Sequence, residues 1–237
     1  FEDIYWGRWF YPINVLALCL AALPFAFGSL RSGGFGKRLF IGIVIGRFSF
    51  MRVPPAASPQ AVVLQSGTAL SPARPLPDFQ LLRQDGAAVG RDDFRGRWTL
   101  VFFGFTHCPE LCPATLAMLS GLRAALEAAV PADQLPGIAL FSADPERDTP
   151  AVLDAYLASF GTGFRGYTGR PEAMREFATA LGVPYRKMPM MGDDYMVDHS
   201  VAILLINPQA EVAALFQPPH ALESLRADYL QVVAAAR

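Results

Sequence analysis

The sequence predicts an α/β fold, with a central mixed sheet flanked by helices and an N-terminal membrane segment ahead of it. Residues 98–103 and 137–142 are short, continuous apolar runs, which are typical of strands buried on both faces of a parallel sheet. Apolar residues at helical spacing lie between the two runs. An uncharged window of 22 residues, 9–30, is long enough to cross a bilayer as a helix.

The composition favours a membrane-associated protein and gives no reason to expect a nucleic-acid partner. Hydrophobic residues make up 52% of the 237 positions and charged residues 17%. The mean hydropathy is +0.28, which is high for a purely soluble chain. The formal net charge of -1 predicts no basic surface for nucleic acid. Three cysteines are too few for a disulfide framework.

The window 9–30 is flanked by features of a membrane helix. Aromatic residues gather at 6–11, as in an interfacial belt, whereas a buried core helix is the alternative interpretation. By the positive-inside rule, the basic residues at 31–38 place the following loop in the cytoplasm. The next apolar run, 39–46, is too short to span the membrane. A folded domain on the opposite side of the membrane from this loop therefore needs either a second membrane crossing or a different start of the chain.

Residues 1–46 resemble the late transmembrane part of the LptF/LptG lipopolysaccharide-export permeases. The similarity is carried by GRWFYP at 7–12 and LPFAFGSLRSGGFGKR at 23–38. We expect a permease-like membrane segment over 1–50, a Pro/Ala-rich linker over 51–77 and a folded domain over 78–237. A joined permease fragment of this size implies no permease activity.

From residue 78 onward, the pattern predicts alternating strands and helices. After the strand at 98–103, leucines spaced by three and four residues predict a helix over 113–130. The second strand, 137–142, is followed by Thr149 and Pro150, which suit the N-cap and first position of a helix that runs to about residue 160.

Further elements complete the predicted order. These are a helix over 171–181, strands over 201–206 and 212–216 joined by the hairpin signal Asn207-Pro208-Gln209-Ala210, and a last helix over 221–235. Strand, helix, strand, helix, then a hairpin and a final helix is the element order of a thioredoxin-like fold.

Cys108 and Cys112 lie between the first predicted strand and the first long helix. The helix N-terminus favours negative charge, so we expect a lowered thiol pKa there. Side chains at i and i+4 hold Cβ atoms about 5–6 Å apart, whereas a disulfide needs about 3.5–4.5 Å. Two metal–sulfur bonds of roughly 2.3 Å span that gap easily. A disulfide and a shared metal ion both remain open.

A third ligand must come from one of three histidines, His107, His199 or His220. His199 directly precedes the strand predicted at 201–206, whose entry faces the active-site loop in a thioredoxin-like fold. Two thiolates and a neutral imidazole suit Cu(I), whereas Zn(II) would take a fourth ligand. The alternative for His199 is a strand-capping hydrogen bond to Asp198.

Three motifs together resemble the Sco/SenC family of copper proteins over residues 65–235. They are FGFTHCPELCP at 103–113, DPERDTP at 144–150 and VDHS at 197–200. The resemblance implies that Cys108, Cys112 and His199 bind copper, as Cu(I) or also Cu(II). It implies delivery of copper to the Cu(A) centre of cytochrome c oxidase, or reduction of that centre's cysteines.

The resemblance also implies a location and partners. The domain is expected in the periplasm, anchored to the bacterial inner membrane, with the oxidase Cu(A) subunit and a thioredoxin-like reductant as partners. The charged motif at 144–150 is expected to be a self-paired turn in which Arg147 ties the loop down and Thr149 caps the next helix.

A thiol–disulfide oxidoreductase is the main alternative, with Cys108 as nucleophile and Cys112 as resolving thiol in a redox disulfide. Thioredoxin-type oxidoreductases keep a cis-proline beside the site, where this chain has Asp198 and His199. A peroxidase is a weaker alternative, because it leaves His199 unexplained. A structural or sensing module would keep the metal without delivering it.

Overall fold

The computed structural model describes residues 63–190 and 194–236. All of them belong to one compact unit, Pro59–Arg237. The predicted membrane segment, 1–50, and most of the predicted linker lie outside the described residues. Within the described ranges, no helix is both long and apolar enough to cross a membrane.

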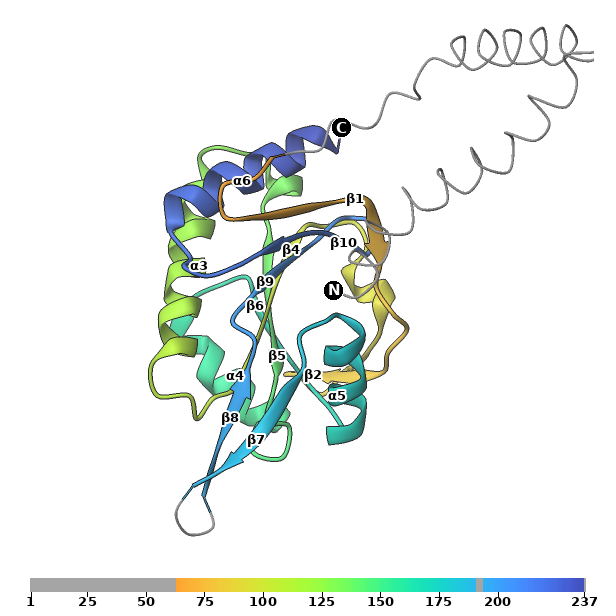
Figure 1. The fold of residues 1–237 in the computed structure, drawn as a ribbon, viewed down its shortest axis with the longest axis vertical. Coiled ribbons are helices and arrows are strands. Elements are labelled where there is room, and N and C mark those ends of the chain that lie inside the picture. Colours follow the sequence, from red (N-terminus) through yellow and green to blue (C-terminus); the bar gives the residue numbers. More distant parts are fainter. Residues whose placement is uncertain (1–62, 191–193, 237) are drawn as a thin grey trace, which may run out of the picture. The chain divides into compact units, whose positions relative to one another are not determined.

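The unit is built on an eight-stranded mixed sheet with the order β1-β10-β9-β4-β5-β6-β2-β3 (Figure 1). β4, β5 and β6 pair in parallel, and the other neighbours pair antiparallel. The strands are β1 (Gly67–Pro75), β2 (Leu81–Arg83), β3 (Ala88–Val89), β4 (Thr99–Gly104), β5 (Gly137–Ser142), β6 (Phe164–Thr168), β9 (Ile203–Ile206) and β10 (Glu211–Phe216). A mixed sheet of this kind is the one the sequence predicted.

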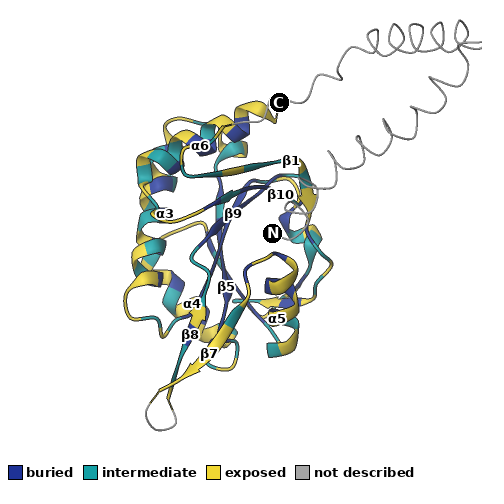
Figure 2. Ribbon diagram, in the orientation of Figure 1, coloured by how far each residue is buried: buried dark blue, intermediate teal, exposed yellow. Residues whose placement is uncertain are grey.

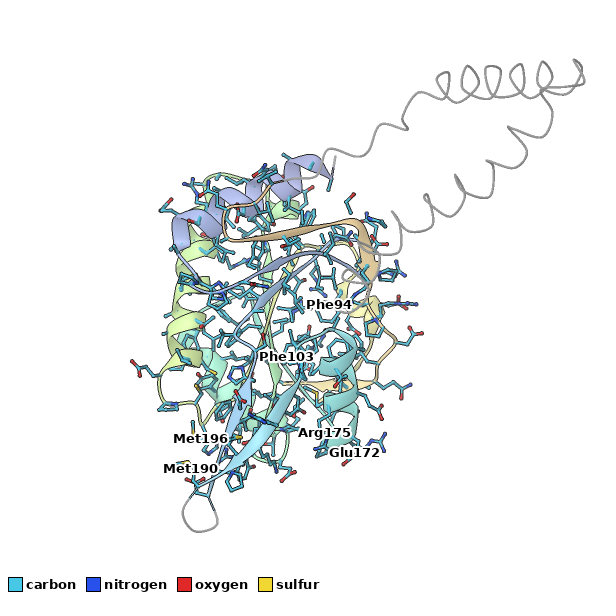
Figure 3. The ribbon with its side chains drawn as sticks, viewed as in Figure 1. Phe94, Phe103, Glu172, Arg175, Met190 and Met196 are labelled. Carbon is cyan, nitrogen blue, oxygen red and sulfur yellow. The ribbon has the colours of Figure 1, made fainter. Side chains whose placement is uncertain are left out.

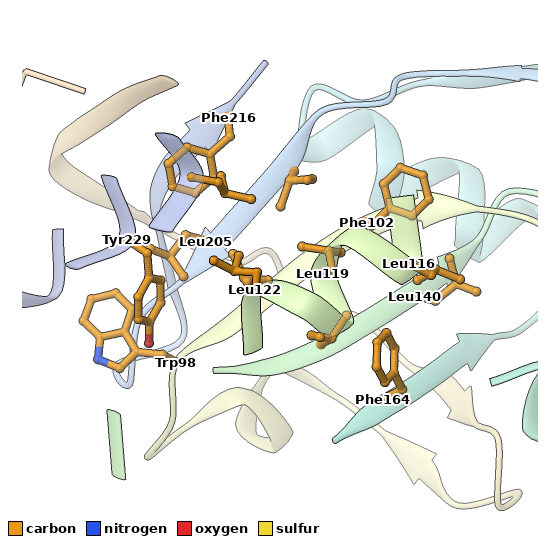
Figure 4. Packing of buried hydrophobic residues seen from close by; sticks show 14 of the residues in the cluster. Trp98, Phe102, Leu116, Leu119, Leu122, Leu140, Phe164, Leu205, Phe216 and Tyr229 are labelled. Carbon is orange, nitrogen blue, oxygen red and sulfur yellow. The ribbon is translucent and has the colours of Figure 1, made fainter. Parts of the chain in front are cut away.

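Helices cover both faces of the sheet. They are α3 (Leu111–Glu127), α4 (Pro150–Leu157), α5 (Pro171–Ala180) and α6 (Leu222–Ala235), with short 3-10 turns at Arg91–Phe94, Ala132–Gln134 and Ala158–Phe160. α3, α4 and α6 supply one hydrophobic cluster, and α5 with the first 3-10 turn supplies the other. Figure 4 shows part of the first cluster, where leucines of α3 meet aromatic side chains of the sheet.

The central strands are buried because their side chains alternate between these two clusters. Leu100 and Phe102 of β4 lie in the first cluster, whereas Val101 and Phe103 lie in the second. This is the period-two alternation of a strand with an apolar layer on each face. Figure 2 shows the same result as a dark core of central strands with exposed helix surfaces outside it.

The structure differs from the predicted linker over its last part. Residues 67–75 form β1, which pairs with β10 at the edge of the sheet, with a register shift between Ala69 and Arg74. Prolines predicted a linker there, but an edge strand tolerates proline because one of its sides needs no ladder hydrogen bonds. The N-terminus of the fold therefore begins before residue 78.

A second, two-stranded sheet is not hydrogen-bonded to the first, although its buried Val197 packs into the first hydrophobic cluster. β7 (Tyr185–Pro189) and β8 (Tyr195–His199) form an antiparallel hairpin in which Tyr185 lies opposite His199. The hairpin projects from the end of the main sheet in Figure 1, and Figure 3 places Met190 and Met196 on it. Its sequence has neither clear alternation nor an apolar run, which is why it was not predicted.

Candidate metal site

The two cysteines lie where the sequence predicted, at the carboxyl end of β4. The chain leaves Gly104, forms a loop that carries Cys108, and enters α3 at Leu111, two residues earlier than expected. Cys112 is therefore in the first turn of the helix and is fully buried, whereas Cys108 is half-buried. Both are free thiols, and the backbone N–H of Cys112 donates to Cys108 Sγ at 3.4 Å.

His199, the last residue of β8, contacts Cys112. Its Nε2 lies 3.7 Å from Cys112 Sγ. Its Nδ1 lies 2.9 Å from the carbonyl oxygen of Ser200, which can only accept a hydrogen bond. Nδ1 therefore carries the ring proton, and Nε2 presents its lone pair to the thiol. Edge contacts with Phe102 and Phe105 hold the ring plane in place.

The other two histidines lie elsewhere. His107 is exposed, with Nδ1 3.1 Å from Thr106 Oγ1. His220 Nε2 donates to the carbonyl oxygen of Val201 at 2.8 Å. Cys19 lies outside the described residues. Of the predicted set, Cys112 contacts both Cys108 and His199, whereas the described residues show no contact between Cys108 and His199 and no group of three such side chains placed to hold a metal.

Burial shifts the pKa values of both Cys112 and His199, the two side chains in contact. Desolvation raises the pKa of the Cys112 thiol above its ordinary value, so the expectation of a lowered pKa is wrong for this cysteine. The helix N-terminus favours a thiolate, but removing the sulfur from water costs more. Desolvation also lowers the pKa of His199, which keeps its imidazole neutral over a wider pH range. A metal ion binding here would displace the Cys112 proton.

The Cys112 side chain packs directly against Gly104, where there is no room for a Cβ atom. A Cβ atom at this position would lie 2.9 Å from Cys112 Sγ and 2.8 Å from Phe102 Cε1. Such contacts are too short, so any larger residue would push the thiol away from His199 or displace the Phe102 ring.

We predict that Gly104→Ala lowers the free energy of unfolding by about 1–3 kcal/mol, the usual cost of overpacking a core. Denaturant unfolding measures this change. Gly137→Ala is the matched control, because a Cβ at the start of β5 would meet nothing closer than 3.9 Å. Equal stability for the Gly104 variant and wild type would contradict the packing described here.

The loop after β5 supports the cysteine loop through a buried carboxylate that sequence reasoning missed. Asp148 accepts hydrogen bonds from Thr106 Oγ1 at 2.6 Å, from the Thr106 backbone N–H at 3.3 Å and from Ser142 Oγ at 2.7 Å. Burial raises the pKa of Asp148, although these hydrogen bonds act in the opposite direction. Thr106, two residues before Cys108, is thereby fixed to the adjacent loop.

The predicted roles of Arg147 and Thr149 are confirmed. The Arg147 guanidinium forms an ion pair with buried Asp144, and the Thr149 side chain accepts a hydrogen bond from Val152 N–H at 3.4 Å to cap α4. The Asp198 side chain, the alternative partner of His199, instead pairs with Arg186 at 3.1 Å.

Comparison with known proteins now places the chain. The family model described as SCO1/SenC matches residues 68–234, which is most of the chain and includes all three candidate residues. The chain belongs to the SCO1/SenC family. A relative from Stutzerimonas stutzeri, named as a copper-binding protein, is 35% identical over 70% of this chain and 81% of its own length.

Two further Sco proteins are similar to this chain over about two thirds of its length. The mitochondrial SCO1 homolog 1 of Arabidopsis thaliana is 35% identical over 62% of this chain, which spans 43% of that relative's length. The structure of Bradyrhizobium japonicum ScoI with copper bound matches with a TM-score of 0.59 and 33% identity, over 67% of this chain and 99% of the other.

Proposed function

We propose that this Sco protein binds copper through Cys108, Cys112 and His199. The contact that carries the proposal is the 3.7 Å separation between Cys112 Sγ and the unprotonated Nε2 of His199. Taking zinc bond lengths of about 2.3 Å to sulfur and about 2.0–2.1 Å to nitrogen as a guide, this separation would allow both atoms to bind one ion. Soft thiolate ligands would select Cu(I).

Cys108 completes the set by a small movement. Among the described residues, no three His, Cys, Asp or Glu side chains stand grouped as a metal site. The Cys108 thiol accepts the N–H of Cys112 and is half-buried, so rotation about its side-chain bond releases it toward a bound ion. The ion would then have one ligand on the solvent side, Cys108, and two ligands further inside, Cys112 and His199.

We propose that the bound copper is delivered to the Cu(A) centre of cytochrome c oxidase, the role that the Sco/SenC resemblance implies. Copper in the Bradyrhizobium relative supports the choice of metal. The domain would act in the periplasm, anchored to the inner membrane; because the basic residues at 31–38 place the loop after segment 9–30 in the cytoplasm, this topology requires a second crossing or a different start of the chain.

The same two thiols give the site a redox-controlled state. Oxidation would form a Cys108–Cys112 disulfide with loss of two electrons and two protons to a disulfide or quinone oxidant, leaving no thiolate to bind copper. A thioredoxin-like reductant would restore the dithiol. In this account the disulfide is the unloaded state rather than a catalytic intermediate.

Anaerobic titration of the full chain with Cu(I), against a colorimetric Cu(I) chelator, tests the proposal. We expect one tightly bound Cu(I) per chain and a loss of affinity on the order of 100-fold in His199→Ala. A residue that binds the metal directly should matter at least as much as the groups that orient metal ligands, whose loss costs about 10–100-fold in affinity. His107→Ala is the matched control and should bind as wild type. Absent Cu(I) binding together with insulin-reductase activity would instead support the oxidoreductase.

A further inference from the structure

The loop at 144–148, which follows β5, contacts both halves of the candidate site. On the cysteine side, Asp148 holds Thr106 by accepting hydrogen bonds from its hydroxyl and its backbone N–H. On the histidine side, Asp144 and Arg147 reach the hairpin. β4 and β5 are parallel neighbours, so their following loops emerge at the same edge of the sheet. One loop therefore lies between the ligands that come from α3 and the ligand that comes from β8.

The hairpin that carries His199 depends on such support. β7 and β8 pair only with each other and not with the main sheet. An isolated two-stranded hairpin is at best marginally stable in water. Figure 2 shows its outer part exposed, and Met190 at its end is 53% exposed. Ring contacts with Phe102 and Phe105 orient His199 itself, and the position of the strand that carries it is set by buried Val197 and by further contacts along the hairpin.

Tyr195, at the start of β8, makes the central contact with the loop. Its hydroxyl donates to Asp144 Oδ1 at 2.7 Å, and Asp144 is fully buried. The Arg147 guanidinium carbon lies 3.9 Å from the centre of the Tyr195 ring, and Arg147 donates to the Tyr195 carbonyl oxygen at 3.2 Å. Arg147 also pairs with Asp194 at 3.3 Å.

A second strand is held in the same way. Lys187 of β7 pairs with Glu146 at 2.5 Å and lies 4.4 Å from the centre of the Tyr195 ring. The aromatic ring thus lies close to two cations, and an electron-rich ring face favours such contacts. Because Asp144 also pairs with Arg147, the carboxylate, the guanidinium and the phenol form one closed cluster.

We propose that Asp144, Arg147 and Tyr195 are positioning residues that hold His199 at bonding distance from the cysteines. This inference rests on the proposed copper function. The cluster touches no candidate ligand itself; it fixes the strand, and the strand fixes His199 four residues further on. By linking Thr106 and the hairpin to one loop, residues 144–148 set the separation between the sulfur and nitrogen ligands.

Tyr195→Phe in two backgrounds tests the proposal by a double-mutant cycle with the full chain. The change removes only the hydroxyl bond to Asp144 and keeps the ring beside Arg147. In the wild-type background, we expect Cu(I) affinity to fall about tenfold, the low end for groups that orient a metal ligand. In the His199→Ala background, we expect Tyr195→Phe to change affinity by less than about twofold, because the ligand that the cluster positions is gone.

Arg147→Gln and Tyr229→Phe complete the design. Arg147→Gln breaks more contacts and should lower affinity further, again only when His199 is present. Tyr229→Phe removes a hydroxyl bond to the Gln134 carbonyl remote from the site, so it should leave Cu(I) affinity unchanged. Equal losses in both backgrounds, or no loss in either, would overturn the positioning role while leaving the copper function intact. Wild-type protein that binds no Cu(I) would overturn both.

Discussion

Replacing Cys112 with serine is expected to lower Cu(I) affinity by on the order of 10²–10³-fold. Structural zinc sites bind with about 10–16 kcal/mol through four ligands, or about 2.5–4 kcal/mol for each ligand. Each 1.4 kcal/mol corresponds to tenfold in affinity. A serine hydroxyl is a hard donor that Cu(I) does not favour, so the replacement leaves the ligand place effectively empty.

Cys108→Ser provides the comparison that separates binding from folding. We expect a similar loss of Cu(I) affinity, because both sulfurs are proposed ligands. The stability cost should be smaller for Cys108, which is half-buried, than for Cys112, which is fully buried among apolar side chains. Competition titrations and denaturant unfolding measure the two effects. Retention of wild-type Cu(I) affinity in the Cys112 variant would contradict its role as ligand.

Asp228→Ala is expected to lower the free energy of unfolding by about 3 kcal/mol. Asp228 of α6 is fully buried and accepts the Gln65 N–H at 2.8 Å, the Ser66 N–H at 2.7 Å and the Ser66 hydroxyl at 2.6 Å. Hydrogen bonds to charged groups contribute about 1.5–3 kcal/mol each, but they are not additive where water can enter. Losing all three frees the start of β1 from the last helix.

Graded variants check that these hydrogen bonds are the cause. Ser66→Ala removes one of the three and should cost about 1 kcal/mol, while Asp228→Asn keeps an acceptor and should fall between the two. The exposed Asp133→Ala serves as a control that should stay within about 0.5 kcal/mol of wild type. An Asp228→Ala protein as stable as that control would contradict the account of how β1 is held.

The central part of the fold follows from local sequence patterns. The apolar runs at 98–103 and 137–142 became β4 and β5, and the helical spacing after them became α3, because burial on both faces leaves a continuous apolar signal. β1 carries prolines, and the short strands β2 and β3 carry too few residues for a pattern to emerge. Their places are set by tertiary contacts, such as Asp228 with Ser66 across 162 positions.

For the candidate site too, some residues could be predicted from the sequence and others could not. The spacing of Cys108 and Cys112 was visible in the sequence, and the motif resemblance added His199. Tyr195 and Asp148 were missed because their roles depend on partners far along the chain, 51 and 42 residues away. The raised pKa of Cys112 was also missed, since burial of a first-turn residue is decided by the packing around it.

X-ray absorption spectroscopy of the Cu(I)-loaded full chain tests the central claim most directly, because it reports the atoms bonded to copper. The account predicts two sulfur ligands and one nitrogen ligand in wild type, with the nitrogen lost in His199→Ala and retained in His107→Ala. A wild-type site with sulfur ligands alone, or a nitrogen ligand that persists in His199→Ala, would contradict it.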